Sequence, residues 1–176
     1  MGPGQVHDTG RRSVNEIITL EAWEYVHAST VGAGRFAANF GRQNAAHYLP
    51  DAMEDDRTAQ VAGAIAELAV AKFTNRYWSG SVWQQGDHDL HKLKPDVGRN
   101  IEVKRVRTRD AAVRQKQVGL GLVLFVARPI EREFRQVEIW GWLPYDVAWE
   151  LGDPAEYDRS GLTRTIARDR LNLGLP

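Results

Sequence analysis

Hydrophobic residues along the chain follow two different spacings. Between about positions 58 and 77 they recur at the intervals that place side chains on one buried face of an α-helix. The members of this stripe are Val61, Ala64, Ile65, Leu68, Ala69 and Phe73. Residues 122–127 and 137–143 are shorter runs with β-branched and aromatic residues, which are typical of strands. The pattern predicts a chain that combines helices with strands.

Weaker patterns complete the predicted order of elements. We expect a helix at 16–29 that is interrupted or ended by the glycines of Val31-Gly32-Ala33-Gly34, a possible strand at 81–85, a short helix at 111–117, and closing helices at 146–149 and 163–171. The sum is an α/β fold with a mixed central β-sheet flanked by helices. Residues 14–176 are predicted to form a single domain, and residues 1–13, rich in glycine and polar residues, a flexible N-terminal tail.

The segment between the helix and the later strands carries the candidate chemistry. Pro95-Asp96 is followed, after five intervening residues, by Glu102-Val103-Lys104. Gly98 and Asn100 lie between them and favour a turn, so the segment is predicted to form a hairpin. Side chains alternate along a strand, so Glu102 and Lys104 share one face.

The length of the turn decides whether Asp96 joins that face. A two-residue turn would pair position 96 with position 101 and put Asp96 on the wrong face, whereas a three-residue turn over 98–100 pairs Asp96 with Glu102. A functional site therefore requires the longer turn. The alternative is a surface hairpin whose Asp96, Glu102 and Lys104 form ordinary exposed ion pairs.

Glu67 supplies a third carboxylate beside the buried stripe of the predicted helix. It lies in a row with the small residues Gly63 and Ala71, which would allow a sheet or a ligand to approach closely. In the alternative interpretation, Glu67 is a helix-favouring residue at the boundary of the core, paired with a cation.

These residues resemble the PD-(D/E)xK nuclease superfamily, in which a helix with a glutamate precedes a hairpin with the P-D and E-x-K residues, then a helix and a strand. Glu67, Asp96, Glu102 and Lys104 match that order over roughly residues 56–145. The resemblance implies a restriction-endonuclease-like core. Members include restriction endonucleases, junction resolvases, phage recombination exonucleases and repair nickases. The chain has no cysteine, which excludes the iron–sulfur subgroup.

The expected chemistry is hydrolysis of a phosphodiester bond with Mg²⁺ or Mn²⁺. We expect Asp96, Glu102 and the carbonyl of Val103 to be metal ligands, with Glu67 acting through water or on a second ion. Lys104 is expected to orient the attacking water or to stabilise charge in the transition state.

The distribution of charge favours a nucleic-acid partner. The formal net charge is zero, but residues 99–116 contain seven basic residues and two acidic ones. The candidate phosphate-binding residues are Arg99, Arg105, Arg107, Arg109, Arg114 and Lys116. A solvated basic face without a partner is the alternative. Strict alternation would put Arg105 and Arg107 on the apolar face, so the strand is expected to end, twist or bulge near residue 105.

Three further features remain open at this stage. Asp87-His88-Asp89-Leu90-His91 could supply metal ligands, although an exposed loop explains it better. Trp140 and Trp142 could stack on bases, but the core is the favoured place for them. Gln115 and Gln117 occupy the place where some exonuclease relatives keep a helix glutamine, and a polar helix face explains them equally well.

The sequence thus predicts a metal-dependent deoxyribonuclease, either a structure-selective endonuclease or an exonuclease, with DNA as its partner. A non-catalytic nucleic-acid-binding or structural assembly protein that keeps the fold is the alternative, and a ribonuclease remains open. No apolar run is long enough to span a membrane and no secretion signal is evident, so a cytoplasmic location is expected. A homo-oligomer is possible.

Overall fold

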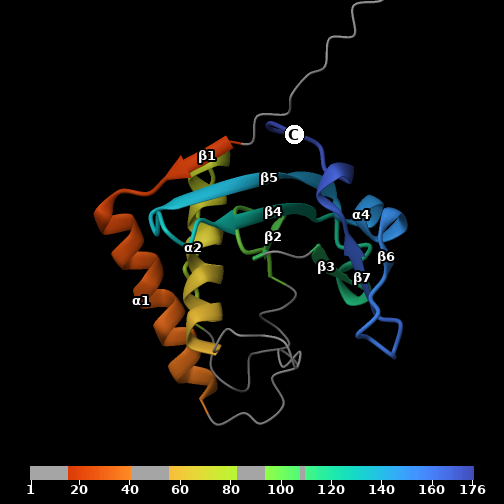
Figure 1. Ribbon diagram of the computed structural model, residues 1–176, viewed down its shortest axis with the longest axis horizontal. Coiled ribbons are helices and arrows are strands. Elements are labelled where there is room, and N and C mark those ends of the chain that lie inside the picture. Colours follow the sequence, from red (N-terminus) through yellow and green to blue (C-terminus); the bar gives the residue numbers. More distant parts are fainter. Residues whose placement is uncertain (1–15, 41–55, 83–93, 108–109) are drawn as a thin grey trace, which may run out of the picture.

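The computed structural model describes residues 16–40, 56–82, 94–107 and 110–176, which form two β-sheets and flanking helices (Figure 1). The helices are α1 (Ala22–Asn39), α2 (Asp56–Thr74) and α4 (Tyr145–Leu151), with short 3-10 helices η1 (Gln115–Gln117) and η2 (Arg168–Arg170). The strands are β1 (Glu16–Thr19), β2 (Ile101–Arg105), β3 (Ala111–Arg114), β4 (Val123–Pro129), β5 (Gln136–Pro144), β6 (Asp153–Pro154) and β7 (Thr163–Ile166).

The central sheet is mixed, as the sequence predicts. Its four strands lie in the order β1-β5-β4-β2, with β2 parallel to β4 and the other pairs antiparallel. The apolar run from Leu124 to Ala127 in β4 is completely buried, because β4 lies inside the sheet and both of its faces are covered. β2 lies at the edge of the sheet.

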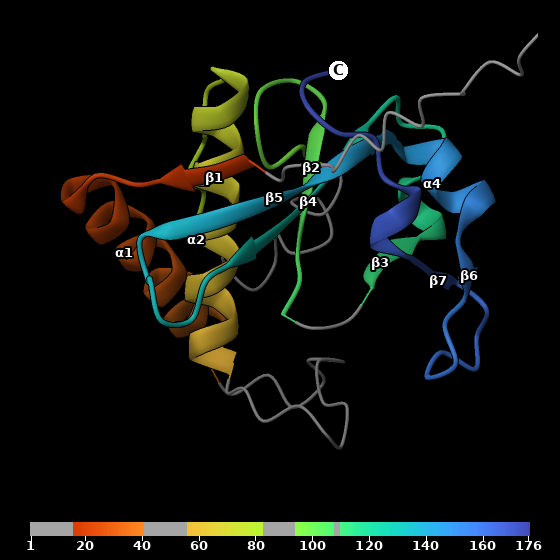
Figure 2. The ribbon, with the colours of Figure 1, turned by 45° about the horizontal axis from the view of Figure 1, so that its top comes forward.

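Each face of the central sheet has its own core. On one face, α1 and α2 pack over Phe125 and Ala127 of β4 in a first core. On the other face, Leu124 and Val126 pack in a second core. Residues of β3, β7 and α4 pack against that second face, where the sequence predicts helices (Figure 2).

The sequence places both ends of the first helix wrongly. Residues 16–19 form β1 because their β-branched side chains suit a strand that pairs with β5. The helix begins at Ala22 and continues through Gly32 and Gly34 to Asn39. A Cβ built at Gly32 would lie 2.4 Å from the Cα of Val61, so this glycine lets α1 approach α2 closely and does not end the helix.

The predicted helices at 111–117 and 163–171 both begin as strands. Residues 111–114 and 163–166 pair with each other as β3 and β7, and only 115–117 and 168–170 are helical. Each strand is too short to be stable alone, so each forms only by pairing with a segment about fifty residues away in the chain. The helix expected at 146–149 is present within α4, and the helix expected at 58–77 is α2, which ends at Thr74.

A β-bulge at Trp140 separates the two tryptophans of β5. Val126 pairs with Gly141 and Ala127 with Ile139, so Trp140 is an extra residue. Trp140 is buried in the second core, whereas Trp142 packs against the first core, in agreement with the core interpretation of both.

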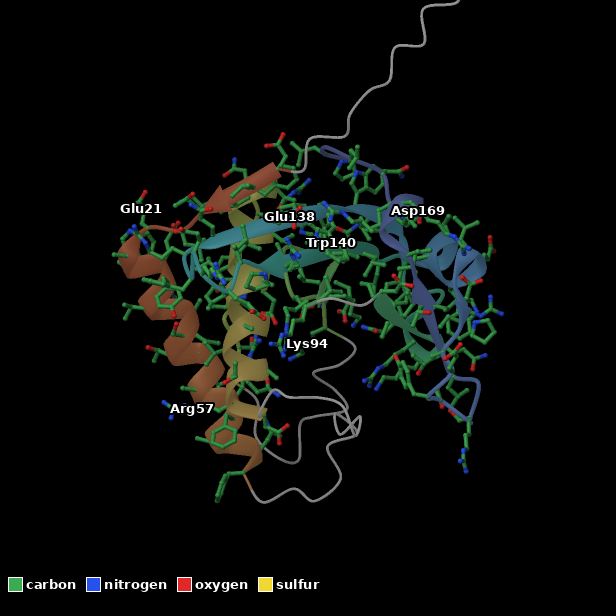
Figure 3. The ribbon with its side chains drawn as sticks, viewed as in Figure 1. Glu21, Arg57, Lys94, Glu138, Trp140 and Asp169 are labelled. Atoms are coloured by element: carbon green, nitrogen blue, oxygen red, sulfur yellow. The ribbon has the colours of Figure 1, made fainter. Side chains whose placement is uncertain are left out.

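Beside the bulge, the carboxylate of Glu138 accepts hydrogen bonds from Trp140 at 2.9 Å and from Arg168 at 2.7 Å (Figure 3). Arg128 forms an ion pair with the same carboxylate at 2.8 Å. This cluster joins β4, β5 and η2.

None of the helices in the described ranges is both long enough and apolar enough to cross a membrane.

Candidate active site

The turn before β2 is the three-residue turn that a functional hairpin requires. The backbone N–H groups of Val97 and Ile101 donate to each other's carbonyl oxygens, both at 3.1 Å, which leaves residues 98–100 in the turn. Gly98 opens the turn with φ +60°, a conformation that glycine adopts without steric cost. Continued by one residue, this register sets Asp96 opposite Glu102.

The edge of β2 that points away from β4 faces Asp96. On the other edge, the N–H of Val123 in β4 donates to the carbonyl of Asn100 at 2.7 Å, and every second residue of β2 continues this ladder. The N–H and C=O of Val103 therefore point away from β4. The Val103 N–H donates to Oδ2 of Asp96 at 2.8 Å. The Val103 carbonyl thus lies along the same edge as the Asp96 carboxylate.

Glu102 and Lys104 share a face of β2, as alternation predicts. Ile101 and Val103 point the other way and pack in the first core. The Lys104 ammonium donates to Oε1 of Glu102 in an ion pair, and only 9% of the Glu102 side chain and 21% of the Lys104 side chain are exposed. The alternative of an exposed surface pair is wrong for these two residues.

Gln117 and Tyr145 lie beside Lys104 at this site; the sequence left the role of Gln117 open and did not point to Tyr145. Lys104 Nζ lies 3.4 Å from Oε1 of Gln117, and the Tyr145 hydroxyl donates to the same oxygen at 2.8 Å. Gln117 is buried and Gln115 exposed, so a polar helix face does not explain Gln117. The resemblance pointed to the position of Gln117. No local pattern marks Tyr145, which comes from α4.

The charges of the site influence one another. Burial raises the pKa of the Asp96 carboxyl well above its usual value, and the neighbouring carboxylates of Glu67 and Glu102 raise it further. Burial alone would lower the pKa of Lys104, but Glu102 and other nearby groups outweigh it and raise that pKa. Lys104 is therefore an ammonium ion beside Glu102.

Glu67 lies on α2 and is held by a buried cation. Arg35 of α1 donates to both of its carboxylate oxygens, at 2.6 and 2.8 Å, and Trp78 Nε1 donates to Oε2 at 2.9 Å. Arg35 also donates from Nε to the carbonyl of Ser81 at 2.9 Å. The structure therefore agrees with the alternative interpretation of Glu67, a glutamate that is paired with a cation at the boundary of the core. Because both oxygens already accept hydrogen bonds, Glu67 is not arranged as a direct metal ligand in this structure.

The basic residues proposed for phosphate binding come from several elements. Arg99 is exposed in the hairpin turn, Arg105 is half-buried at the end of β2, and exposed Arg107 pairs with Glu131 at 2.7 Å. β2 ends at residue 105, where the sequence predicts that regular alternation stops. Farther along the chain, Arg114 ends β3 and Lys116 lies exposed in η1.

Some predictions fall outside the described residues. They are the phosphate contact of Arg109, the Asp87–His91 cluster, the tail at 1–13 and most of the possible strand at 81–85. The described part of that last segment, Ser81 and Val82, has no regular secondary structure.

The oxygen donors of the site fit a small divalent cation. Mg²⁺ and Mn²⁺ prefer carboxylate and carbonyl oxygens, which Asp96, Glu102 and the carbonyl of Val103 provide around the edge of β2. Within residues 16–40, 56–82, 94–107 and 110–176, no three Asp, Glu, His or Cys side chains come together as a metal-binding group.

No family model matches this chain, and neither a curated protein nor a solved structure matches it.

Proposed function

We propose that this chain is a Mg²⁺- or Mn²⁺-dependent deoxyribonuclease of the PD-(D/E)xK type, with a restriction-endonuclease-like core formed by α2, the hairpin, β4 and β5. The observation that carries the proposal is the three-residue turn, because it sets Asp96 opposite Glu102. A turn one residue shorter would have separated the two carboxylates. Two features depart from the expected arrangement of that superfamily. Glu67 is paired with Arg35, and a small second sheet packs beside the second core.

Each residue has a defined task in this proposal. Asp96, Glu102 and the Val103 carbonyl hold the metal ion, which when bound activates water and neutralises phosphate charge. Lys104 places a positive charge beside Glu102, where it stabilises negative charge on the phosphate or orients water. Glu67 acts from a distance, since its carboxylate raises the pKa of Asp96.

The substrate is DNA, cleaved by structure-selective or exonucleolytic action. The basic residues of 99–116 support a nucleic-acid partner because the same stretch of chain contains Glu102 and Lys104 of the site. One observation favours the alternative of a non-catalytic nucleic-acid-binding or structural protein: Arg35 holds the Glu67 carboxylate in a buried pair.

The test of this function is cleavage of labelled linear, circular, single-stranded and branched DNA, and of RNA, with EDTA, Mg²⁺ or Mn²⁺. We expect cleavage of DNA only with the metal. Asp96→Asn and Glu102→Gln should each lower the rate by at least about a hundredfold, because each removes the charge of a metal ligand. Glu156→Gln removes the charge of an exposed acid outside the site and should leave the rate unchanged.

Lys104→Ala separates the two roles within the site. It should lower turnover by about a hundredfold or more and leave metal affinity, measured by calorimetry, near that of the wild type. Wild-type protein that cleaves neither DNA nor RNA but binds DNA would support the non-catalytic alternative. Full activity in Asp96→Asn and Glu102→Gln would move the active site elsewhere, and preferential cleavage of RNA would identify a ribonuclease.

A further inference from the structure

Tyr145 brings a polar group into an apolar core. It is the first residue of α4, directly after β5, and its side chain is completely buried in the second core. A buried phenol costs free energy unless its hydroxyl finds hydrogen-bond partners. A phenylalanine would fill the same space at no such cost. The contacts of the hydroxyl therefore show what this tyrosine contributes.

The hydroxyl connects the two ends of η1. It accepts a hydrogen bond from the backbone N–H of Arg114 at 2.9 Å and donates its proton to Oε1 of Gln117 at 2.8 Å. Arg114 immediately precedes η1, and Gln117 is its last residue. The bond to Gln117 is formed away from water, since Gln117 is only 3% exposed. Tyr145 therefore fixes the direction of the Gln117 amide.

The fixed oxygen of Gln117 points at Lys104. Lys104 Nζ lies 3.4 Å from it, and the same ammonium donates to Glu102. Glu102 is the residue proposed to hold the metal, so its carboxylate serves two cations when the site is loaded. Gln117 gives the ammonium a second acceptor that does not depend on the metal ligand. The longer distance leaves room for this contact to tighten when the site binds its ligands.

We propose that Tyr145 is a positioning residue, which acts through Gln117 to hold the Lys104 ammonium in place for the reaction. The inference rests on the proposed nuclease function, because it assigns a task to the same lysine. The path is a chain of three side chains from α4, η1 and β2. It joins the second core to the edge of the central sheet.

The first experiment compares Tyr145→Phe with Tyr25→Phe. Tyr25 packs partly buried against the first core, on the other face of the sheet, and serves as the matched control. We expect Tyr145→Phe to lower kcat about tenfold, the effect of one lost hydrogen bond, with KM and metal affinity within about twofold of wild type. Tyr25→Phe should leave all of these unchanged.

A double-mutant cycle tests whether Tyr145 acts through Lys104. In a Lys104→Ala background, Tyr145→Phe should change the residual rate less than about twofold, because the group it positions is already gone. An equal loss in both backgrounds would mean that Tyr145 supports the fold alone and would overturn the proposal. If Tyr145→Phe does not fold, Gln117→Met removes the same acceptor while Tyr145 stays in the core, and the same cycle applies.

A measurement without catalysis keeps this inference separate from the proposed function. The ¹⁵N signal of a lysine ammonium survives hydrogen exchange only where the group is held, and Lys104→Arg identifies the signal of Lys104. We expect that signal in wild type and its loss in Tyr145→Phe. An unchanged signal and an unchanged kcat would overturn the positioning role while leaving the nuclease proposal intact. Wild-type protein that cleaves no nucleic acid would overturn the nuclease proposal, and the catalytic role of Tyr145 with it.

Discussion

At the scale of single residues, Asp96 is an acid whose surroundings disfavour its ionised form. Its carboxyl is partly buried, has Glu67 and Glu102 as neighbours, and receives one backbone hydrogen bond, from Val103. Burial and like charge raise its pKa, so ionising Asp96 in the folded protein costs free energy. A bound cation would relieve that cost. The ionised carboxylate of Asp96 therefore lowers the stability of the folded protein.

Asp96→Asn should therefore stabilise the metal-free protein above acidic pH. A carboxyl whose folded pKa is raised contributes stability that is fully present below its unfolded pKa and is lost as pH rises through the folded pKa. The stability gain of Asp96→Asn over wild type should start near zero at about pH 4 and grow as pH rises towards neutrality. Urea unfolding in EDTA across this range measures it. A gain that is the same at every pH would contradict the assigned pKa direction.

Arg35 and Glu67 form a buried ion pair between α1 and α2, in which 3% of the Arg35 side chain is exposed. Removing one member of such a pair leaves a buried charge without its partner. We expect Arg35→Met to lower the free energy of unfolding by about 3–5 kcal/mol. The double variant Arg35→Met/Glu67→Met should recover part of the loss.

The control for this pair is Arg57→Met, which removes an arginine that is exposed on α2 (Figure 3). It should change the free energy of unfolding by no more than about 0.5 kcal/mol. Chemical denaturation of the three variants checks the prediction. If Arg35→Met costs no more than Arg57→Met, the pair does not stabilise the fold and Glu67 is available for another role.

At the scale of elements, the approach of α1 to α2 depends on one glycine. A Cβ at Gly32 would lie 2.4 Å from the Cα of Val61 and 2.8 Å from the carbonyl oxygen of Gln60. Both neighbours are backbone atoms, so the two helices would have to separate. Arg35 lies three residues after Gly32 on α1, so that separation would also pull Arg35 away from Glu67.

Gly32→Ala should accordingly lower the free energy of unfolding by about 1–3 kcal/mol, even though alanine favours helix. Gly63→Ala is the matched control, because a Cβ at Gly63 of α2 meets nothing within 4 Å. That change should stabilise the protein by up to about 1 kcal/mol. Thermal and urea unfolding measure both variants. Equal effects of the two substitutions would show that helix propensity, and not the close contact, determines the outcome.

At the scale of the whole molecule, zero formal net charge conceals an uneven distribution. The basic residues from 99 to 116 begin in the turn before β2, continue through β2 and extend beyond it, and they include Arg105 and Arg107. A nucleic acid that lies across this region would release counterions from its phosphates. Affinity should therefore fall steeply with salt concentration.

Replacing Arg105, Arg107 and Arg109 with glutamine should lower the slope of log affinity against log salt by up to about three units, for all DNA sequences alike. The control replaces three exposed arginines elsewhere, Arg57, Arg132 and Arg159, which changes the net charge equally. Fluorescence anisotropy with an Asp96→Asn protein, in Ca²⁺, measures both slopes. The same slope in both triple variants would mean that DNA follows another path, and no DNA binding by wild type would support a purely structural protein.

The local features of the candidate site could be predicted from sequence. Alternation along β2 puts Glu102 and Lys104 on one face, and the residues at 98–100 suit a three-residue turn. Alternation and turn formation are predictable because each depends only on residues that are neighbours in the chain. The mixed central sheet and α2 were also predictable, since their hydrophobic runs are long and regular.

Contacts between distant parts of the chain decided the rest. Residues 111–114 became β3 only because 163–166 pair with them, and Gly32 permits a close contact of α1 with α2 where the glycines resembled a helix end. Arg35 forms an ion pair with the Glu67 carboxylate, and the Tyr145 hydroxyl donates to Gln117, which in turn contacts Lys104. Turn and alternation are set by backbone geometry within a few residues, whereas partners for a charge or a hydroxyl depend on which elements pack together. The sequence by itself thus determined the candidate residues of the hairpin and their order along it, and only the tertiary structure decided which of them meet and which residues from other elements hold them.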